Sequence, residues 1–435
     1  MVIGRVVSII GLLLCPLMAG ATGDSFSGEL PERTFGLEDI RTLVHQNRSI
    51  IIEQYEDQAA EENLSQSKAL RLPDLKLDGN GYYSNSVPLA RDVQATNAFL
   101  YNVSLSSEFE IYTGGVRKQS IERMKKEQQM SGNRYEAMLN EVELDAFILL
   151  YDIYRNINYK KFIHSSIELR EKEYERIQQL FENGLVLKSD LLRSKLYITD
   201  LQRDEVTIGN SIKILSDRFC VMLGLEEHCS VIPDLEDHLH YAIATSFEDM
   251  WAYASANAPE LQLLRNTRDR EQIVLKEITS TNLPHLKAYA RYGIGSAAQN
   301  LAYHHQLGGE VGLKLTMDFG SFYQDKHRKS SQKYEINKQE MRVAQGEEEL
   351  NSRLLELYTR YQESLVNIER AEQKIEMSEE TTRILRNSYY NQQSLLIDVL
   401  ESETQAMEAS FEWVEAMVDS QKYYWALRYV SGYRG

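Results

Sequence analysis

Four segments of this chain alternate apolar and polar residues with a period of two. The most regular one has apolar side chains at every second position except Ser107, namely Phe99, Tyr101, Val103, Leu105, Phe109 and Ile111. Residues 75–83, 286–294 and 311–317 show the same alternation. This pattern predicts strands of a half-buried sheet with one apolar and one polar face.

The lengths of these strands suggest a membrane setting. Each has about 10 to 12 residues, which suits a tilted strand that crosses a bilayer. The alternative is an ordinary sandwich sheet, which would show more strands. Four strands cannot close a barrel, because the smallest useful number is about eight. Open edges are not tolerated in lipid, so we expect two or three copies of the chain to share one barrel of eight or twelve strands.

Helical periodicity fills most of the remaining chain. Apolar residues at a spacing near 3.5 form one stripe in each half, with Leu350, Leu354, Leu357, Tyr361, Leu365, Ile368 and Ile375 in the second half and Leu139, Val142, Ala146, Leu149, Ile153 and Ile157 in the first. This spacing is typical of coiled coils. No proline lies between Pro88 and Pro233 or beyond Pro284, so long helices are permitted. A helix from Gly114 to Gly184 would have about 70 residues and a length of about 100 Å.

Short sequence anchors recur at similar offsets. Leu72-Pro73 returns as Leu283-Pro284 (283 − 72 = 211), and Asp190 returns as Asp398 (398 − 190 = 208). We interpret the chain as a tandem duplication of about 210 residues. The first repeat would span residues 22–218 and the second 251–435, each with a helix, two strands and two long helices. Residues 219–250 would connect the repeats as an equatorial belt.

The N-terminus predicts export. Arg5 precedes an apolar run at residues 6–18, and Ala19-Gly20-Ala21 is a cleavage site, so residues 1–21 are predicted to be a signal peptide. Cys15 raises a lipoprotein alternative, which the large Leu14 before it disfavours. The formal net charge of −17 excludes a general nucleic-acid binder, because such a protein needs a basic face for phosphates.

Two cysteines, Cys220 and Cys229, remain after signal cleavage. An exported compartment permits a disulfide between them, and two free thiols are the equal alternative. His228 beside Cys229 suggests a metal corner, but further ligands are missing, so no metal is predicted. The sequence has no phosphate-binding loop, nucleophile elbow or zinc spacing, so neither an enzyme nor a cofactor is predicted.

Taken together, these motifs resemble the TolC-like outer-membrane efflux proteins. The resemblance rests on the two Leu-Pro strand starts, the Gly114-Gly115 corner and two helical-turn motifs, at residues 181–192 and 389–401. It implies an α+β membrane protein whose duplicated chain gives four transmembrane β-strands and long antiparallel coiled-coil helices. Three copies would form a twelve-stranded β-barrel in the outer membrane with an α-helical tunnel in the periplasm.

The resemblance also implies residues at the inner tip of the tunnel. Asp398 and Glu401 share a helix face and would supply a constriction ring of carboxylates, although a solvated helix face is the simpler alternative. Tyr389 and Asp190 match a latch between neighbouring coils, whereas Tyr389 would otherwise only pack in the coil. A family member has an arginine at the position of Ser394, so the latch would be weaker or built differently here.

The turns between the long helices are candidates for docking an adaptor. Gly184, Leu185, Val186, Ser394 and Leu395 form this predicted docking tip, because exposed apolar tips often mark interfaces. The same apolar residues would alternatively belong to the coil core. Gly184 permits a positive φ and its counterpart Gln392 does not favour one, so we expect the two turns to differ.

The predicted function is that of an export duct. The homotrimer would dock to a periplasmic adaptor, or membrane fusion protein, and to an inner-membrane pump of the proton-driven or ABC type. Drug efflux, metal-ion efflux and type I protein secretion all use such ducts, and the pump rather than the duct selects the cargo. The alternative from another class is an extracytoplasmic coiled-coil protein with a structural or adhesion role and no channel.

Overall fold

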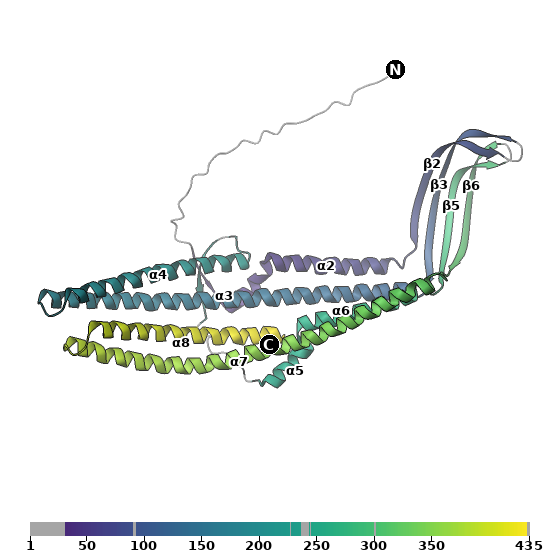
Figure 1. Cartoon of the computed structure of the whole chain (residues 1–435). Coiled ribbons are helices and arrows are strands. Elements are labelled where there is room, and N and C mark those ends of the chain that lie inside the picture. Colours follow the sequence, from purple (N-terminus) through teal and green to yellow (C-terminus); the bar gives the residue numbers. More distant parts are fainter. Residues whose placement is uncertain are drawn as a thin grey trace, which may run out of the picture.

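The computed structural model describes residues 31–89, 93–226, 228–235, 243, 245–299 and 302–432. The predicted signal peptide at residues 1–21, including Cys15, lies outside these ranges. In the described part, a curved sheet rises from one end of a long helical body, and the opposite end is formed by two helical turns (Figure 1).

The sheet contains β2 (Asp74–Leu89), β3 (Val93–Thr113), β5 (His285–Gln299) and β6 (Ala302–Thr316) in the order β2-β3-β5-β6. All neighbouring pairs are antiparallel. With 16, 21, 15 and 15 residues, the strands are longer than the 10 to 12 expected. The alternation of side chains fades before the backbone ladder ends, so residues beyond each alternating segment also belong to the strands.

The predicted apolar face of the sheet is present and exposed. Residues paired across an antiparallel ladder point to the same side. Leu77 pairs with Leu105, which pairs with Tyr292, and these side chains are 75%, 47% and 59% exposed. On the other face, Lys287 makes an ion pair of 3.0 Å with Glu110. The sheet therefore presents a continuous apolar surface on one side and charged groups on the other.

Four helices make up most of the body, as the proline-free tracts predicted. They are α3 (Val116–Glu182), α4 (Lys188–Met222), α7 (Ser321–Tyr390) and α8 (Leu396–Ser431). The 67 residues of α3 and the 70 of α7 agree with the expected length. Turns join α3 to α4 and α7 to α8, which gives two antiparallel hairpins (Figure 1).

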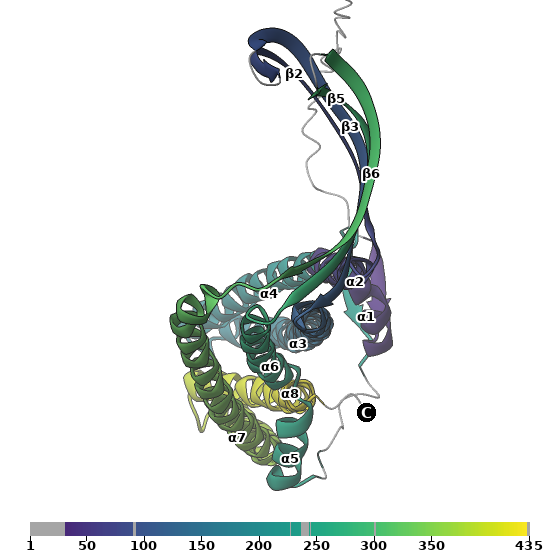
Figure 2. The same ribbon diagram turned by 90° about the vertical axis from the view of Figure 1, so that its right-hand side faces the viewer.

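Shorter helices complete the body. The helices α4 and α2 (Arg48–Ala69) lie end to end alongside α3, with α4 nearer the tip and α2 nearer the sheet (Figure 1). The helix α6 (Pro259–Ser280) lies between α3 and α7. The order helix, strand, strand, long helix, helix therefore occurs twice, with matching helices of 22 and 22, 67 and 70, and 35 and 36 residues. Seen along the body, α3 lies at the centre of the bundle (Figure 2).

A small parallel sheet lies midway along the body. Its strands are β1 (Glu32–Phe35) and β4 (Ser230–Pro233), and the short helices α1 (Leu37–Leu43) and η1 (Val44–Gln46) follow β1 along the chain. The short helix α5 (Phe247–Asn257) packs against α6, α7 and α8 instead. The main apolar core is here, with Phe35, Phe147 and Phe219 fully buried. The sequence pattern gave no sign of this strand pairing, because each strand has four residues. In the described part of the chain, no helix is both long and apolar enough to cross a membrane.

Candidate functional site at the helical tip

The two turns at the tip have the same backbone conformation. Gly184 has a φ of +73° and Gln392 a φ of +59°, both in the left-handed region. In each turn the residue donates its N–H to the carbonyl three positions earlier at 2.9 Å, on Phe181 and on Tyr389. The difference expected from Gln392 is therefore not found in the backbone of the two turns. The hydrogen bonds that end a helix select this conformation, and glutamine adopts it at a cost of roughly 1–2 kcal/mol.

An apolar cluster ties the two hairpins together just behind the turns. Ile177 of α3 packs with Leu396 and Leu400 of α8, and all three are at most 6% exposed. Val186 and Tyr389 pack against this cluster. Part of the predicted docking tip is therefore coil core.

The remaining docking-tip residues lie at the surface or cap a helix. Leu185 is 54% and Leu395 is 68% exposed, and Gly184 is exposed with no atom near its missing side chain. Ser394 is half-buried, and its hydroxyl donates to the carbonyl of Leu385 at 3.2 Å. The hydroxyl thus satisfies a carbonyl at the end of its own hairpin.

The two predicted constriction carboxylates lie at the start of α8. Asp398 is half-buried, and its carboxylate accepts the backbone N–H of Leu395 at 3.2 Å, which caps the helix. Glu401 is exposed one turn further along the same face. Asp398 therefore has a structural role in the single chain, whereas Glu401 projects freely into solvent.

The acidic face of α8 continues well beyond these two residues, which the sequence analysis missed. Asp398, Glu401, Gln405, Glu408, Glu412, Glu415 and Asp419 follow one another at alternating intervals of three and four. This heptad spacing keeps them on one face, and it could have been found from the sequence. The face extends over 21 residue steps (419 − 398), or about 32 Å at 1.5 Å per step.

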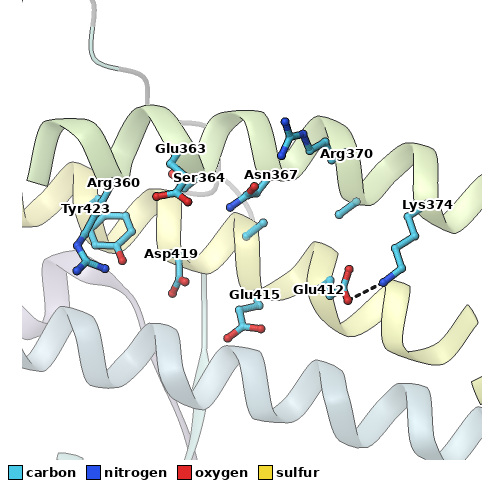
Figure 3. A pocket seen from close by; sticks show the side chains of 12 residues that line it. Arg360, Glu363, Ser364, Asn367, Arg370, Lys374, Glu412, Glu415, Asp419 and Tyr423 are labelled. Carbon is cyan, nitrogen blue, oxygen red and sulfur yellow. Dashed lines mark hydrogen bonds and ion pairs between the residues drawn. The ribbon is translucent and has the colours of Figure 1, made fainter. Parts of the chain in front are cut away.

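The C-terminal end of this acidic face borders a cleft of about 470 Å³ between α7 and α8. Figure 3 shows cationic side chains of α7 beside the carboxylates of α8. Lys374 makes an ion pair of 2.6 Å with Glu412. Burial raises the pKa of Asp419, Lys422 opposes this shift, and Glu415 adds to it. The cleft thus balances charges of both signs.

The predicted latch residues are neighbours without a bond. The Tyr389 hydroxyl is buried and has no hydrogen-bond partner within the described residues. Burial raises the pKa of Tyr389 to about 12, and the nearby charge of Asp190 contributes to this shift. The structure therefore brings Tyr389 and Asp190 into electrostatic contact, while the hydroxyl keeps an unused donor.

A second polar group, also missed from the sequence, lies deeper in the tip. Arg170 and Glu173 of α3 meet Arg386 of α7 and Glu403 of α8. Arg386 lies 2.9 Å from Glu173 and 2.6 Å from Glu403, and Arg170 pairs with Glu403. Arg170 is 4% and Glu403 is 8% exposed. No pattern within one segment of the sequence reveals this group, because its residues come from three separate helices.

The Arg170–Glu403 pair belongs to a long antiparallel seam between α3 and α8. Towards the equator, Lys422 pairs with Asp152 at 2.5 Å, and the indole N–H of Trp425 donates to the Tyr151 hydroxyl at 3.3 Å. The seam thus changes along its length, from large aromatic side chains near the equator, through buried charges, to the small apolar cluster at the turns.

Cys220 and Cys229 meet at the equator, far from the tip. Their sulfur atoms are 2.8 Å apart and not bonded, and both side chains are buried. His228 contacts Asp217 rather than the two thiols. Among the residues that the structure describes, no three His, Cys, Asp or Glu side chains are grouped so that they could hold a metal ion.

Comparisons with known proteins give matches at the level of structure. Neither models of protein families nor curated protein sequences match this chain. A membrane protein from Pseudomonas aeruginosa superposes with a TM-score of 0.79 at 12% identity, covering 95% of each chain. The outer-membrane protein VceC from Vibrio cholerae gives a TM-score of 0.76 at 14% identity, covering 91% of this chain and 96% of its own.

The outer-membrane channel CmeC from Campylobacter jejuni matches over 91% of this chain and 85% of its own, with a TM-score of 0.77 and 11% identity. The elements that these superpositions cover include the sheet and both helical hairpins, since they span nearly the whole chain. The chain therefore has the fold of the TolC-like outer-membrane efflux channels, as its turn motifs and strand starts predicted.

Proposed function

We propose that this protein is the outer-membrane duct of a tripartite efflux or type I secretion system. The observation that carries the proposal is the union of an exposed apolar sheet with a long helical body that ends in an acidic tip. Channels rather than enzymes share this fold, which fits a non-enzymatic role. The exposed apolar face disfavours a purely structural coiled-coil protein, because such a face would be unstable in water.

Three copies would form the working channel. The sheet has open edges at β2 and β6, and these strands run in opposite directions. The β6 edge of one copy can therefore pair antiparallel with the β2 edge of the next. Three such junctions would close twelve strands into a barrel, with the apolar face towards lipid and the charged face towards the pore. The helical bodies would then continue the pore as a tunnel in the periplasm.

The tip would close the tunnel and contact its partners. In a trimer, Asp398 and Glu401 would form two rings of three carboxylates. Carboxylates about 6 Å apart repel by roughly 3 kcal/mol at an effective dielectric constant of about 20, so closed rings would favour cations. The exposed Leu185 and Leu395 remain the best candidates for docking a periplasmic adaptor that belongs to an inner-membrane pump.

Ion selectivity in planar lipid bilayers tests this proposal. The purified outer-membrane oligomer should form cation-preferring channels, and the double variant Asp398→Asn, Glu401→Gln should lose several-fold of that preference. The matched control is Glu175→Gln, which removes an exposed carboxylate from α3. An oligomer that inserts but does not conduct would overturn the duct, and unchanged selectivity in the double variant would overturn the ring.

A further inference from the structure

The charged group behind the tip connects all four long helices. Arg170 and Glu173 belong to α3, Arg386 to α7 and Glu403 to α8. The guanidinium of Arg170 also lies over the ring of Tyr197 from α4, with its central carbon 4.6 Å from the ring centroid. The first hairpin is thus joined to the second by charges that are largely shielded from water.

We propose that Arg386 is a positioning residue that holds the constriction carboxylates in the closed arrangement, an inference that rests on the proposed duct function. Arg386 is the cation that α7 contributes, and it bridges two carboxylates on different helices, Glu173 and Glu403. Guanidinium groups suit this task, because their planar fork can engage two acceptors at once. Without Arg386, both carboxylates would depend on Arg170, which lies 3.8 Å from Glu173.

The link to the constriction follows from the geometry of α8. Glu403 lies two residues after Glu401, so the two side chains point to opposite faces of the helix. Their burial agrees with this, since Glu401 is exposed and Glu403 is 8% exposed. Fixing Glu403 against α3 and α7 therefore also fixes how far Glu401 extends on the other side.

The turn between α7 and α8 contains no cation that could replace this arrangement, which we call the Arg386 clamp. Residues 391–395 include no lysine or arginine, and the Ser394 hydroxyl donates to the carbonyl of Leu385. Arg386 lies eight residues earlier (394 − 386), on the other side of the same turn. The clamp thus places a cation between the hairpins where the turn itself supplies none.

Single-channel conductance of the Arg386→Gln oligomer tests the clamp. We expect a higher conductance or a larger open fraction than in the unmodified protein. The matched control is Arg383→Gln, because Arg383 lies three residues earlier on α7, is exposed and pairs within its own helix with Glu380 at 2.7 Å. The control should conduct like the unmodified protein.

A conservative variant separates positioning from folding. Arg386→Lys keeps the charge but lacks the fork, so it should give an intermediate conductance in normally assembled oligomers. If Arg386→Gln assembles and conducts like Arg383→Gln, the clamp is overturned. If Arg386→Gln does not assemble, an unchanged conductance of Arg386→Lys overturns it equally. A lack of conductance in the unmodified protein would instead refute the duct itself.

Discussion

Gly184 and Gln392 show how far the backbone conformation of a single turn residue can be predicted from the sequence. The left-handed conformation of Gly184 was predictable, because glycine after a helix end is a common signal. Gln392 gives no such signal, yet it adopts the same φ, because two hydrogen bonds of the turn require it. The side-chain preference is thus overridden by backbone hydrogen bonding.

Replacement of Gln392 by glycine should stabilise the second turn. Glycine pays no steric penalty at positive φ, so Gln392→Gly should stabilise the closed turn by about 1 kcal/mol. Slower hydrogen–deuterium exchange in peptides that cover residues 385–396 would show this. The neighbouring substitution Gln393→Gly is the control, because the φ of Gln393 is not positive and added backbone freedom should speed exchange there. Faster exchange in both variants would contradict the expectation.

Tyr389 offers a separate test of the latch. If its buried hydroxyl bonds to Asp190 in the assembled channel, Tyr389→Phe removes about 1 kcal/mol of closure, which corresponds to a roughly fivefold higher open population. Conductance and leak of the assembled oligomer would report the change. Tyr390→Phe is the matched control, because this neighbour packs over Arg176 instead. Equal conductance of the two variants would discard the latch.

At the scale of elements, long-range periodicity was a better guide than local alternation. The helices α3 and α7 have nearly their expected lengths, because uninterrupted coiled-coil spacing marks a helix along its whole course. The strands extend beyond their alternating cores, because backbone pairing needs no particular side chain. The pairing of β1 with β4 and the buried charges around Arg386 join distant parts of the chain, and neither leaves a pattern within one segment.

The contact between Cys220 and Cys229 favours the disulfide over free thiols. One thiol lies on the last turn of α4 and the other directly before β4, and their sulfurs are already 2.8 Å apart. An oxidising protein disulfide of the cell envelope would accept the two electrons and two protons as the bond forms. Protein taken from the envelope and denatured with an alkylating agent should carry no label on either cysteine until it is reduced. Two labelled cysteines without reduction would establish free thiols instead.

This disulfide should also stabilise the equator. Closing a loop of nine residues (229 − 220) contributes roughly 2–3 kcal/mol in the chain-entropy view. The double variant Cys220→Ser, Cys229→Ser should therefore unfold at a lower denaturant concentration than the unmodified protein. The unmodified protein under reducing conditions is the control and should shift by a similar amount. An unchanged midpoint in both cases would show that the bond contributes nothing.

At the scale of the whole molecule, one chain supplies both sheet edges that the proposed junctions between copies would join. The sheet supplies two complementary edges, and the body supplies two hairpins that are fastened to each other by the α3–α8 seam. Near the equator the seam contains large aromatic side chains beside the Lys422–Asp152 ion pair, and towards the tip the buried Arg170–Glu403 ion pair takes their place. This gradient suits a body that stays rigid at its middle while its tip separates, because ion pairs can exchange partners whereas interlocked rings cannot.

The unpaired edges of β2 and β6 have a consequence for the life of the protein before assembly. Each edge presents a row of free N–H and C=O groups beside exposed leucines, which is a template for aggregation. A folded copy that has not assembled is therefore prone to aggregate, and its aggregation becomes faster as its concentration rises. The fate of such a copy depends on whether it binds further copies of the same chain before chaperones or proteases bind it. For the proposed trimer, the abundance of assembled channels would rise more steeply than the rate of synthesis, because assembly would need three copies at once.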